Sequence, residues 1–379
     1  MIGLQTGVPM PDQPSLPPLT VRGIWATAVE VPPTFILGTS RGAFRQVPLL
    51  LIDVETEEGI TGRAYLFCYL RTIAPAIISV IDDVEDAIKD DRVDPAALWG
   101  KLAGRYALIG VQGIVRMALA GLDVACWDAL AIAARQPLAL LLGAEPRPVA
   151  AYNSCGLGLM EDLGALAAEA EKLIAVANFR AVKLRLGYPT LARDIAAVHA
   201  VRKRIGEKVA LMVDYNQALG VDEALARGRA LDQENIYWLE EPIRHDDYAG
   251  AARLARELKT SIQIGENFSL PAGMATALEQ AKPDCVMPDL ERIGGVTGWR
   301  QAAELAAAQN VKMSSHLFPE VSAHLLAATP TCHYLEYVDW ANALVQEPLV
   351  LADGQALPTD RPGNGMVWDE KAVARFRMT

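Results

Sequence analysis

Short apolar runs alternate with longer, alanine-rich amphipathic segments from about residue 146 to residue 345. Each run has the length of a buried strand, and each intervening segment is long enough for a helix. Eight strands with seven intervening helices are typical of a closed parallel barrel without its last helix, (β/α)7β. The sequence therefore predicts an α/β fold whose larger domain is a modified TIM barrel. The predicted strands are Val149–Ser154, Ala181–Leu186, Val209–Tyr215, Ile236–Leu239, Ile262–Gly265, Cys285–Met287, Val311–Ser314 and Tyr334–Leu335.

Residues 21–145 follow a different order, with strands first and helices later. Val21–Pro32 and Val47–Phe67 are rich in aliphatic and β-branched residues, and Glu57-Glu58-Gly59 interrupts the second segment as a hairpin turn does. This order predicts an α+β domain that caps the barrel. The predicted helices are Thr72–Lys89, Pro95–Tyr106 and Gln112–Ala134.

Two shorter segments flank these domains. Residues 1–20 contain five prolines and no basic residue, so they lack the charged start of a secretory signal. We interpret them as a flexible leader and expect a cytoplasmic protein. The alternation stops near residue 346, and we expect residues 346–379 to pack back on the capping domain.

Composition and charge narrow the possible partners. Apolar residues make up 51% of the chain and charged residues 21%, which is typical of a globular protein. The net charge is −11 and basic residues do not cluster, so neither nucleic acid nor a membrane surface is an expected partner. The most apolar stretch, Ile114–Leu142, contains four charged residues and is predicted to be a core helix. The five cysteines form no CxxC pair and are interpreted as reduced thiols.

An acidic residue or a histidine follows or ends six successive apolar runs. Because the carboxyl ends of parallel barrel strands meet at one rim, we expect these side chains to converge. A single acid after a strand is usually a helix cap, but six at barrel spacing indicate a functional site. They are Asp214, Glu240, Glu266, Asp289, His316 and Glu336.

Three of these acids on neighbouring strands predict a metal site. Asp214, Glu240 and Glu266 would repel one another without a cation, and carboxylate oxygens suit Mg²⁺ better than Zn²⁺. We expect one Mg²⁺ per subunit. Glu241 is an alternative to Glu240, although neighbours on a strand point in opposite directions and only one can face the ion.

Two cations and a histidine complete the predicted chemistry. Lys183 and Arg185 are two residues apart on a strand, so both are expected to point into the barrel mouth. Asp289 lies one βα unit before His316, which allows its carboxylate to orient the imidazole as a general base.

These motifs resemble the enolase superfamily, and specifically its mandelate racemase subgroup, over residues 21–368. The matching segments are Met-Val-Asp-Tyr-Asn-Gln at Asp214, Trp-Leu-Glu-Glu-Pro at Glu240, Gly-Glu-Asn at Glu266, Met-Pro-Asp at Asp289 with the following Ile-Gly-Gly-Val-Thr-Gly-Trp, Ser-Ser-His-Leu-Phe at His316, and Ser-Ala-His-Leu-Leu-Ala-Ala-Thr-Pro-Thr before Glu336. The resemblance implies removal of the proton next to a carboxylate, giving an enediolate stabilised by the metal.

The resemblance also implies individual roles. Lys183 would contact the substrate carboxylate, Glu336 would be an acid that hydrogen-bonds it, and Asn216 and Ser154 would be polar contacts. Mobile loops at Phe35–Gln46 and Tyr65–Arg71 would close the pocket. From these loops Leu37, Phe44 and Tyr69 would meet the substrate side chain. Family members often form dimers or octamers, so we expect a homo-oligomer.

One position departs from the family pattern, because Arg185 stands where the racemase has a second lysine. Arginine stays protonated and is a poor base. The similarity along the whole chain favours a racemase of an α-hydroxy acid. The alternative is a dehydratase of an acid sugar or hydroxy diacid with His316 as the only strong base, and a lesser alternative is a metal-binding protein without turnover. In a dehydratase, a second substrate carboxylate could be held by Arg41, Arg45 or Arg71. A Schiff-base aldolase using Lys183 would leave the three carboxylates unexplained.

Overall fold

The computed structural model describes residues 17–378. The predicted leader therefore lies outside the described residues except for residues 17–20. The amide of Val93 donates to the carbonyl of Leu19, which fixes the chain just before the first strand.

The first domain is a three-stranded antiparallel sheet, in the order β1-β4-β5, with helices packed against it. Gly59, at φ 77°, turns the chain between β4 and β5 where the sequence predicted a hairpin. Asp94 caps α2 by accepting from the amide of Ala97, and Pro95 starts that helix. The elements are β1 (Val21–Val31), β4 (Val47–Thr56), β5 (Thr61–Phe67), α1 (Ile73–Ile88), α2 (Pro95–Arg105), α3 (Gly113–Ala133) and α4 (Leu138–Leu141).

Close packing of α3 on β5 depends on Gly62. A Cβ atom at this position would lie 2.0 Å from the carbonyl oxygen of Ala125 and 2.8 Å from Cβ of Ala129. We expect Gly62→Ala to destabilise the protein by about 3 kcal/mol, because neither backbone can retreat without opening the core. The readout is the midpoint of thermal unfolding. Gly100→Ala is the matched control: Gly100 lies on α2 with open space around it, so alanine should leave the midpoint unchanged or raise it slightly. Equal midpoints of thermal unfolding for Gly62→Ala and Gly100→Ala would contradict the close contact between β5 and α3 at Gly62.

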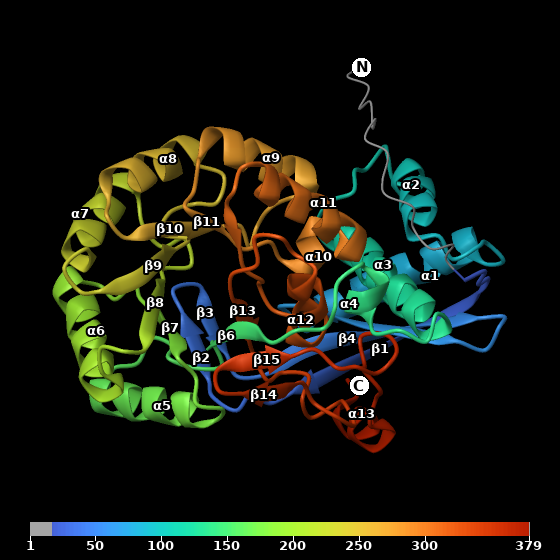
Figure 1. Ribbon diagram of the computed structural model, residues 1–379, viewed down its shortest axis with the longest axis horizontal. Helices are drawn as coiled ribbons and strands as arrows, with labels where there is room; N and C mark the ends of the chain where they lie inside the picture. Colours follow the sequence, from blue (N-terminus) through green and yellow to red (C-terminus); the bar gives the residue numbers. More distant parts are fainter. Residues whose placement is uncertain (1–16, 379) are drawn as a thin grey trace.

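The second domain is the predicted barrel, whose helices surround its strands in Figure 1. Its strands are parallel and pair in sequence order from β6 to β12, and β13 pairs with β6. The amide of Ser315 donates to the carbonyl of Tyr334, and a bridge joins Met313 to Cys332, so β12 and β13 close the barrel. The strands are β6 (Val149–Asn153), β7 (Ala181–Arg185), β8 (Ala210–Asp214), β9 (Ile236–Glu240), β10 (Ser261–Ile264), β11 (Cys285–Val286), β12 (Lys312–Met313) and β13 (Leu335–Tyr337).

Helices follow the strands around the outside of this barrel. The arrangement confirms the predicted α/β fold with a modified TIM barrel and a separate N-terminal α+β unit. The helices are α5 (Leu163–Ala175), α6 (Leu191–Ile205), α7 (Val221–Leu231), α8 (Tyr248–Glu257), α9 (Leu270–Gln280), α10 (Leu290–Ile293), α11 (Gly295–Ala308) and α12 (Pro319–Ala327).

Two hairpins were not predicted. The first, β2 (Leu37–Thr39) and β3 (Gly42–Phe44), lies over the barrel mouth near β7 (Figure 1), where Ser40 Oγ donates to the carbonyl of Tyr215 at 3.0 Å. The second, β14 (Val350–Ala352) and β15 (Gln355–Leu357), extends the barrel sheet because β15 pairs with β6. The following α13 (Glu370–Phe376) contacts β1, so the C-terminal segment touches both domains.

The buried helix α3 shows why its apolar sequence is not a membrane segment. Its Asp123 and Asp128 are buried and accept hydrogen bonds from backbone amides of Thr297 and of Arg63 and Asn364. Within residues 17–378 no helix combines the length and the apolar character needed to cross a bilayer. All five cysteines are free thiols.

Candidate active site

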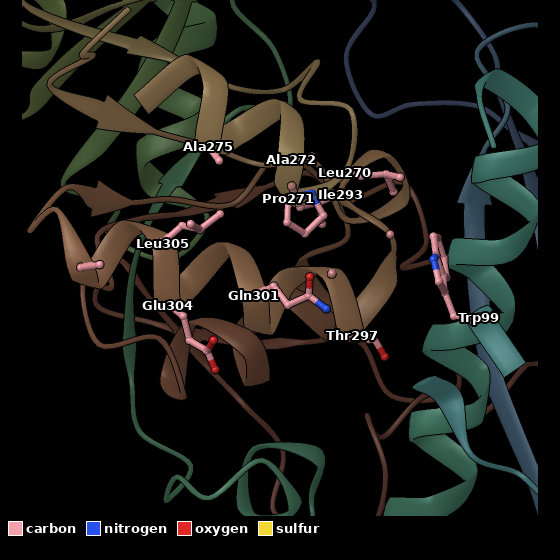
Figure 2. A pocket seen from close by; sticks show the side chains of 13 residues that line it. Trp99, Leu270, Pro271, Ala272, Ala275, Ile293, Thr297, Gln301, Glu304 and Leu305 are labelled. Carbon is pink, nitrogen blue, oxygen red and sulfur yellow. The ribbon is translucent and has the colours of Figure 1, made fainter. Parts of the chain in front are cut away.

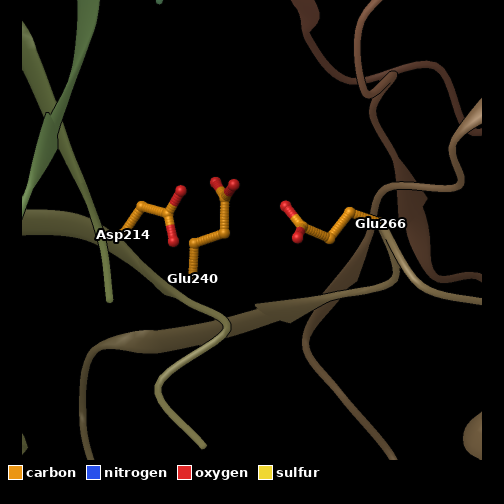
Figure 3. Close-up of side chains that lie close together, drawn as sticks. All are labelled: Asp214, Glu240 and Glu266. Carbon is orange, nitrogen blue, oxygen red and sulfur yellow. The ribbon is translucent and has the colours of Figure 1, made fainter. Parts of the chain in front are cut away.

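Three carboxylates meet at the carboxyl ends of three neighbouring strands. Asp214 ends β8, Glu240 ends β9, and Glu266 follows β10 by two residues. Parallel pairing sets Asp214 beside Glu240, and oxygen atoms of all three side chains lie within 4.8 Å of one another. Figure 3 shows the three carboxylates pointing toward a common point. The barrel register therefore assembles the cluster that the sequence predicted.

Close packing of the three buried carboxylates affects their protonation, although the Lys183 ammonium group beside Asp214 and Glu240 partly offsets their repulsion. Burial raises the pKa of Asp214 and Glu240, and repulsion from the neighbouring carboxylates adds to this effect. Three hard oxygen donors with the opening of a cavity beside them fit a divalent ion such as Mg²⁺, which takes carboxylate oxygens and leaves positions for substrate. The donor set thus fits the expected metal.

Glu241 is not a member of this cluster, whose oxygens belong to Asp214, Glu240 and Glu266. Its Oε1 accepts from the amide of Gly265 at 2.8 Å, and its backbone is left-handed, at φ 38°. A left-handed, non-glycine residue is strained, which is common where a chain holds functional groups in place. The geometry therefore favours Glu240 over Glu241 as the member of the pair that faces an ion.

Lys183 lies at the centre of the acidic side chains. Its Nζ lies 2.5 Å from Glu240 Oε1, 2.8 Å from Glu336 Oε1 and 3.6 Å from Asp214 Oδ2. Burial opposes the charge, but the surrounding carboxylates outweigh burial and raise the pKa of Lys183. Lys183 is therefore a fixed cation that can hold a carboxylate and is poorly suited to accept a proton.

Arg185 reaches the same cavity but is held by the loop after β6. Its Nη1 donates to the carbonyls of Ser154 at 3.1 Å and Gly156 at 2.9 Å, and its Nη2 donates to Ser154 Oγ at 2.7 Å. Ser154 Oγ in turn donates to Glu336 Oε1 at 2.7 Å. Ser154 does not line the cavity: its hydroxyl is engaged on both sides, so it links Arg185 to Glu336 rather than facing a ligand.

His316 and Asp289 form the expected pair. The ring Nδ1 of His316 lies 2.6 Å from Asp289 Oδ2, and its Nε2 lies 3.4 Å from Glu266 Oε2. Asp289 Oδ1 is held separately by the backbone amides of Glu291 and Arg292, at the start of α10. Burial favours neutral imidazole, but the bond to Asp289 and nearby carboxylates raise the pKa of His316. The pair presents Nε2 to the cavity as a base.

Glu336 is an acceptor in this arrangement. It receives hydrogen bonds from Lys183, Ser154 and the amide of Leu317. Burial favours the neutral acid, but Lys183, His316 and Arg185 outweigh it and hold the pKa of Glu336 well below its usual value. The expected role of Glu336, a hydrogen bond to the substrate carboxylate, stays a prediction.

These groups surround a cavity of about 250 Å³ between the barrel mouth and the first domain. Leu37, Phe44, Tyr69 and Asn216 line it as expected. Glu240 and Asp289 lie beneath its surface, fully buried. Three buried side-chain polar atoms of lining residues have no hydrogen-bond partner within residues 17–378, namely the Tyr69 hydroxyl, Arg185 Nε and Asn216 Oδ1.

An aromatic wall closes one side of the cavity. Phe67 lies 5.5 Å from Phe44, 4.1 Å from Tyr69 and 4.7 Å from Trp340, measured between ring centroids. Phe67, Trp340 and Arg292 also line the cavity and were not predicted from the sequence. The sequence held a signal for two of them, because Phe67 lies within the predicted loop Tyr65–Arg71 and Trp340 follows Glu336 at the same barrel rim.

The three arginines that were expected to hold a second substrate carboxylate lie in different places. Of Arg41, Arg45 and Arg71, Arg41 alone lines the cavity. Its guanidinium donates to the carbonyls of Asn216 and Gln217, so it is partly engaged. Arg71 pairs with Glu30 at 2.8 Å.

A larger cavity, of about 620 Å³, lies between α9, α11 and Trp99 of α2. Figure 2 shows its lining to be mainly apolar, with Leu270, Pro271, Ile293 and Leu305. Glu304 is its one ionisable residue. It lacks converging catalytic groups, which favours the smaller cavity at the barrel mouth as the active site.

Comparisons with known proteins agree with the fold and the motifs. The sequence profile of the mandelate racemase / muconate lactonizing enzyme N-terminal domain matches residues 24–143, and that of the enolase C-terminal domain-like family matches residues 165–372. A 3,6-anhydro-alpha-L-galactonate cycloisomerase from Streptomyces coelicolor is 32% identical, over 91% of this chain and 95% of that protein. An L-talarate/galactarate dehydratase from Salmonella typhimurium is 31% identical, over 88% of this chain and 84% of that protein.

A solved structure is similar along almost its whole length. It is an enolase from Bradyrhizobium complexed with magnesium and mandelic acid, 37% identical, with a TM-score of 0.91 over 96% of this chain and 99% of that chain. The chain therefore belongs to the mandelate racemase / muconate lactonizing enzyme family of the enolase superfamily.

Proposed function

We propose that this enzyme is a Mg²⁺-dependent hydro-lyase that dehydrates a carboxylic acid bearing hydroxyl groups on its α and β carbons. Asp214, Glu240 and Glu266 would hold the ion, and His316 would be the only base. Relatives in the family include acid-sugar dehydratases and cycloisomerases, which fits this class of reaction. The three unpartnered polar atoms of Tyr69, Arg185 and Asn216 suit a substrate with several hydroxyl groups.

The residues of this site can carry both proton transfers. Nε2 of His316 removes the α-proton, while Asp289 holds Nδ1–H and stabilises the imidazolium that forms. The imidazolium then returns the proton to the β-hydroxyl, so the C–O bond breaks, water leaves and a C=C bond forms. The resulting enol becomes a 2-keto acid. When bound, Mg²⁺ would supply positive charge at the substrate carboxylate, and Lys183 would hold the same group.

The observation that carries this proposal is the bonding of Arg185. Racemisation by this route needs a base on each side of the α-carbon. Arg185 occupies the position of the second base, yet it is fixed by Ser154 and Gly156, and a guanidinium is a poor base. One base suffices for elimination.

Incubating candidate acids with enzyme and Mg²⁺ in D₂O tests the reaction. We expect a 2-keto acid from acids with α- and β-hydroxyl groups. Recovery of such acids with α-deuterium, loss of optical activity and no keto acid would contradict the proposal.

Arg185→Lys tests the one-base interpretation directly. A lysine beside the Lys183 cation has its pKa lowered and can act as a second base. We expect the native enzyme to exchange the α-proton of only one enantiomer of a 2-hydroxy acid. The variant should exchange the α-proton of the opposite enantiomer at least tenfold faster than the native enzyme does. Proton NMR in D₂O measures both exchange rates. Equal exchange of both enantiomers by the native enzyme would contradict a single base.

A racemase of an α-hydroxy acid is the second candidate. The aromatic wall of Phe44, Phe67 and Trp340 suits an apolar side chain on the substrate, and the Bradyrhizobium relative was solved with mandelic acid. The D₂O experiment separates this candidate from the first. The absence of α-proton exchange with every acid tested would instead favour a metal-binding protein without turnover.

A further inference from the structure

Trp238 lies directly below the acidic cluster, inside the barrel. It is two residues before Glu240 on β9, so both side chains point into the barrel. The indole is fully buried, and its Nε1–H donates to Glu240 Oε2 at 3.0 Å. Neither the catalytic pair nor the substrate cavity uses this side chain.

The two oxygens of Glu240 are held by different kinds of donor. Lys183 binds Oε1 at 2.5 Å with a full charge, and Trp238 binds Oε2 with a neutral N–H. A carboxylate oxygen accepts a hydrogen bond through one lone pair and keeps another for a metal. The indole can therefore orient Glu240 without bringing a second positive charge against the ion.

The packing around Trp238 keeps the indole in one orientation. Its ring lies 5.4 Å from Tyr152, at 85°, and 5.9 Å from Tyr334, at 72°. Met212 of β8 lies in the same buried cluster. An indole fixed on several sides cannot turn away, so its N–H stays aimed at Glu240.

We propose that Trp238 is a positioning residue for the metal site, which holds Glu240 in the conformation that binds the ion. This inference rests on the proposed metal ligands. Residues that hydrogen-bond to a metal-coordinating side chain and orient it typically contribute 10- to 100-fold to metal affinity.

The test compares Mg²⁺ binding to the full-length native protein, Trp238→Phe and Trp299→Phe by calorimetry. We expect Trp238→Phe to bind Mg²⁺ at least tenfold more weakly. Trp299→Phe is the matched control: Trp299 is also buried, on α11, and its Nε1 donates to Thr329 Oγ1 at 3.1 Å instead of to a carboxylate. This variant should lose similar thermal stability and keep its Mg²⁺ affinity.

A second readout remains useful if Trp238→Phe folds poorly. In native protein labelled with ¹⁵N, the indole N–H resonance of Trp238, assigned from the spectrum of Glu240→Gln, should shift when Mg²⁺ is added, whereas that of Trp299 should not. An unchanged Mg²⁺ affinity of Trp238→Phe, or a Trp238 indole resonance that does not shift when Mg²⁺ is added, would overturn the role of Trp238 but not the proposed metal site. A native protein that binds no Mg²⁺ would instead overturn the proposed metal site.

Discussion

His316→Asn is expected to lower the rate of α-proton removal by about 10³-fold. Asparagine can keep a hydrogen bond to Asp289, yet it offers no base to the α-carbon. The neighbouring cations cannot replace the base. The surrounding carboxylates raise the pKa of Lys183, and the guanidinium of Arg185 is a poor base. The measurement is exchange of the α-proton in D₂O together with formation of keto acid.

His199→Asn is the matched control for this prediction. His199 lies on the outer helix α6, where its Nε2 is 2.7 Å from Glu234, and it faces solvent. Its replacement should leave the rate unchanged. A His316→Asn enzyme that keeps a tenth of native activity would show that another group removes the proton.

Glu240→Gln is expected to weaken Mg²⁺ binding by about 100-fold or more, and activity should fall with it at fixed Mg²⁺. The substitution removes one of three ligand charges. It also turns an oxygen that faces Lys183 or Trp238 into an amide nitrogen, which cannot accept either hydrogen bond.

Glu241→Gln is a stringent control because it changes the neighbouring residue in the same way. Glu241 is equally buried, but its Oε1 accepts a hydrogen bond from the amide of Gly265, and glutamine can keep this bond through its carbonyl oxygen. Near-native Mg²⁺ affinity is expected. If Glu241→Gln lost the metal and Glu240→Gln kept it, the assignment of the pair would be reversed.

Much of the site could be predicted from the sequence because a parallel barrel makes position along the chain a guide to position in space. The ends of successive strands form one rim, so the βα rhythm alone places Asp214, Glu240 and Glu266 together. The same rule brought Asp289 next to His316. Alternation along β7 likewise predicted that Lys183 and Arg185 share a face.

Contacts between distant segments could not be predicted in this way. The hairpin of β2 and β3 has only three residues in each strand, and it is held over the barrel by bonds from Ser40 and Arg41 to carbonyls near residue 216. Short strands without a clear apolar alternation give little local signal.

The hydrogen-bond partners of charged residues could not be predicted from the sequence either. A residue type specifies charge but not which acceptors surround it. The sequence placed Arg185 in the barrel mouth, whereas the bonds to Ser154 and Gly156 that fix it come from the loop after β6. The same bonds explain why Ser154 faces Arg185 and Glu336 instead of the cavity.

The most direct test of the metal site is a crystal structure of the protein grown with Mn²⁺ in place of Mg²⁺, with the ion located by its anomalous scattering. We expect a single ion per subunit, bonded to oxygens of Asp214, Glu240 and Glu266. An ion held elsewhere at full occupancy, or none between these carboxylates at millimolar Mn²⁺, would contradict it.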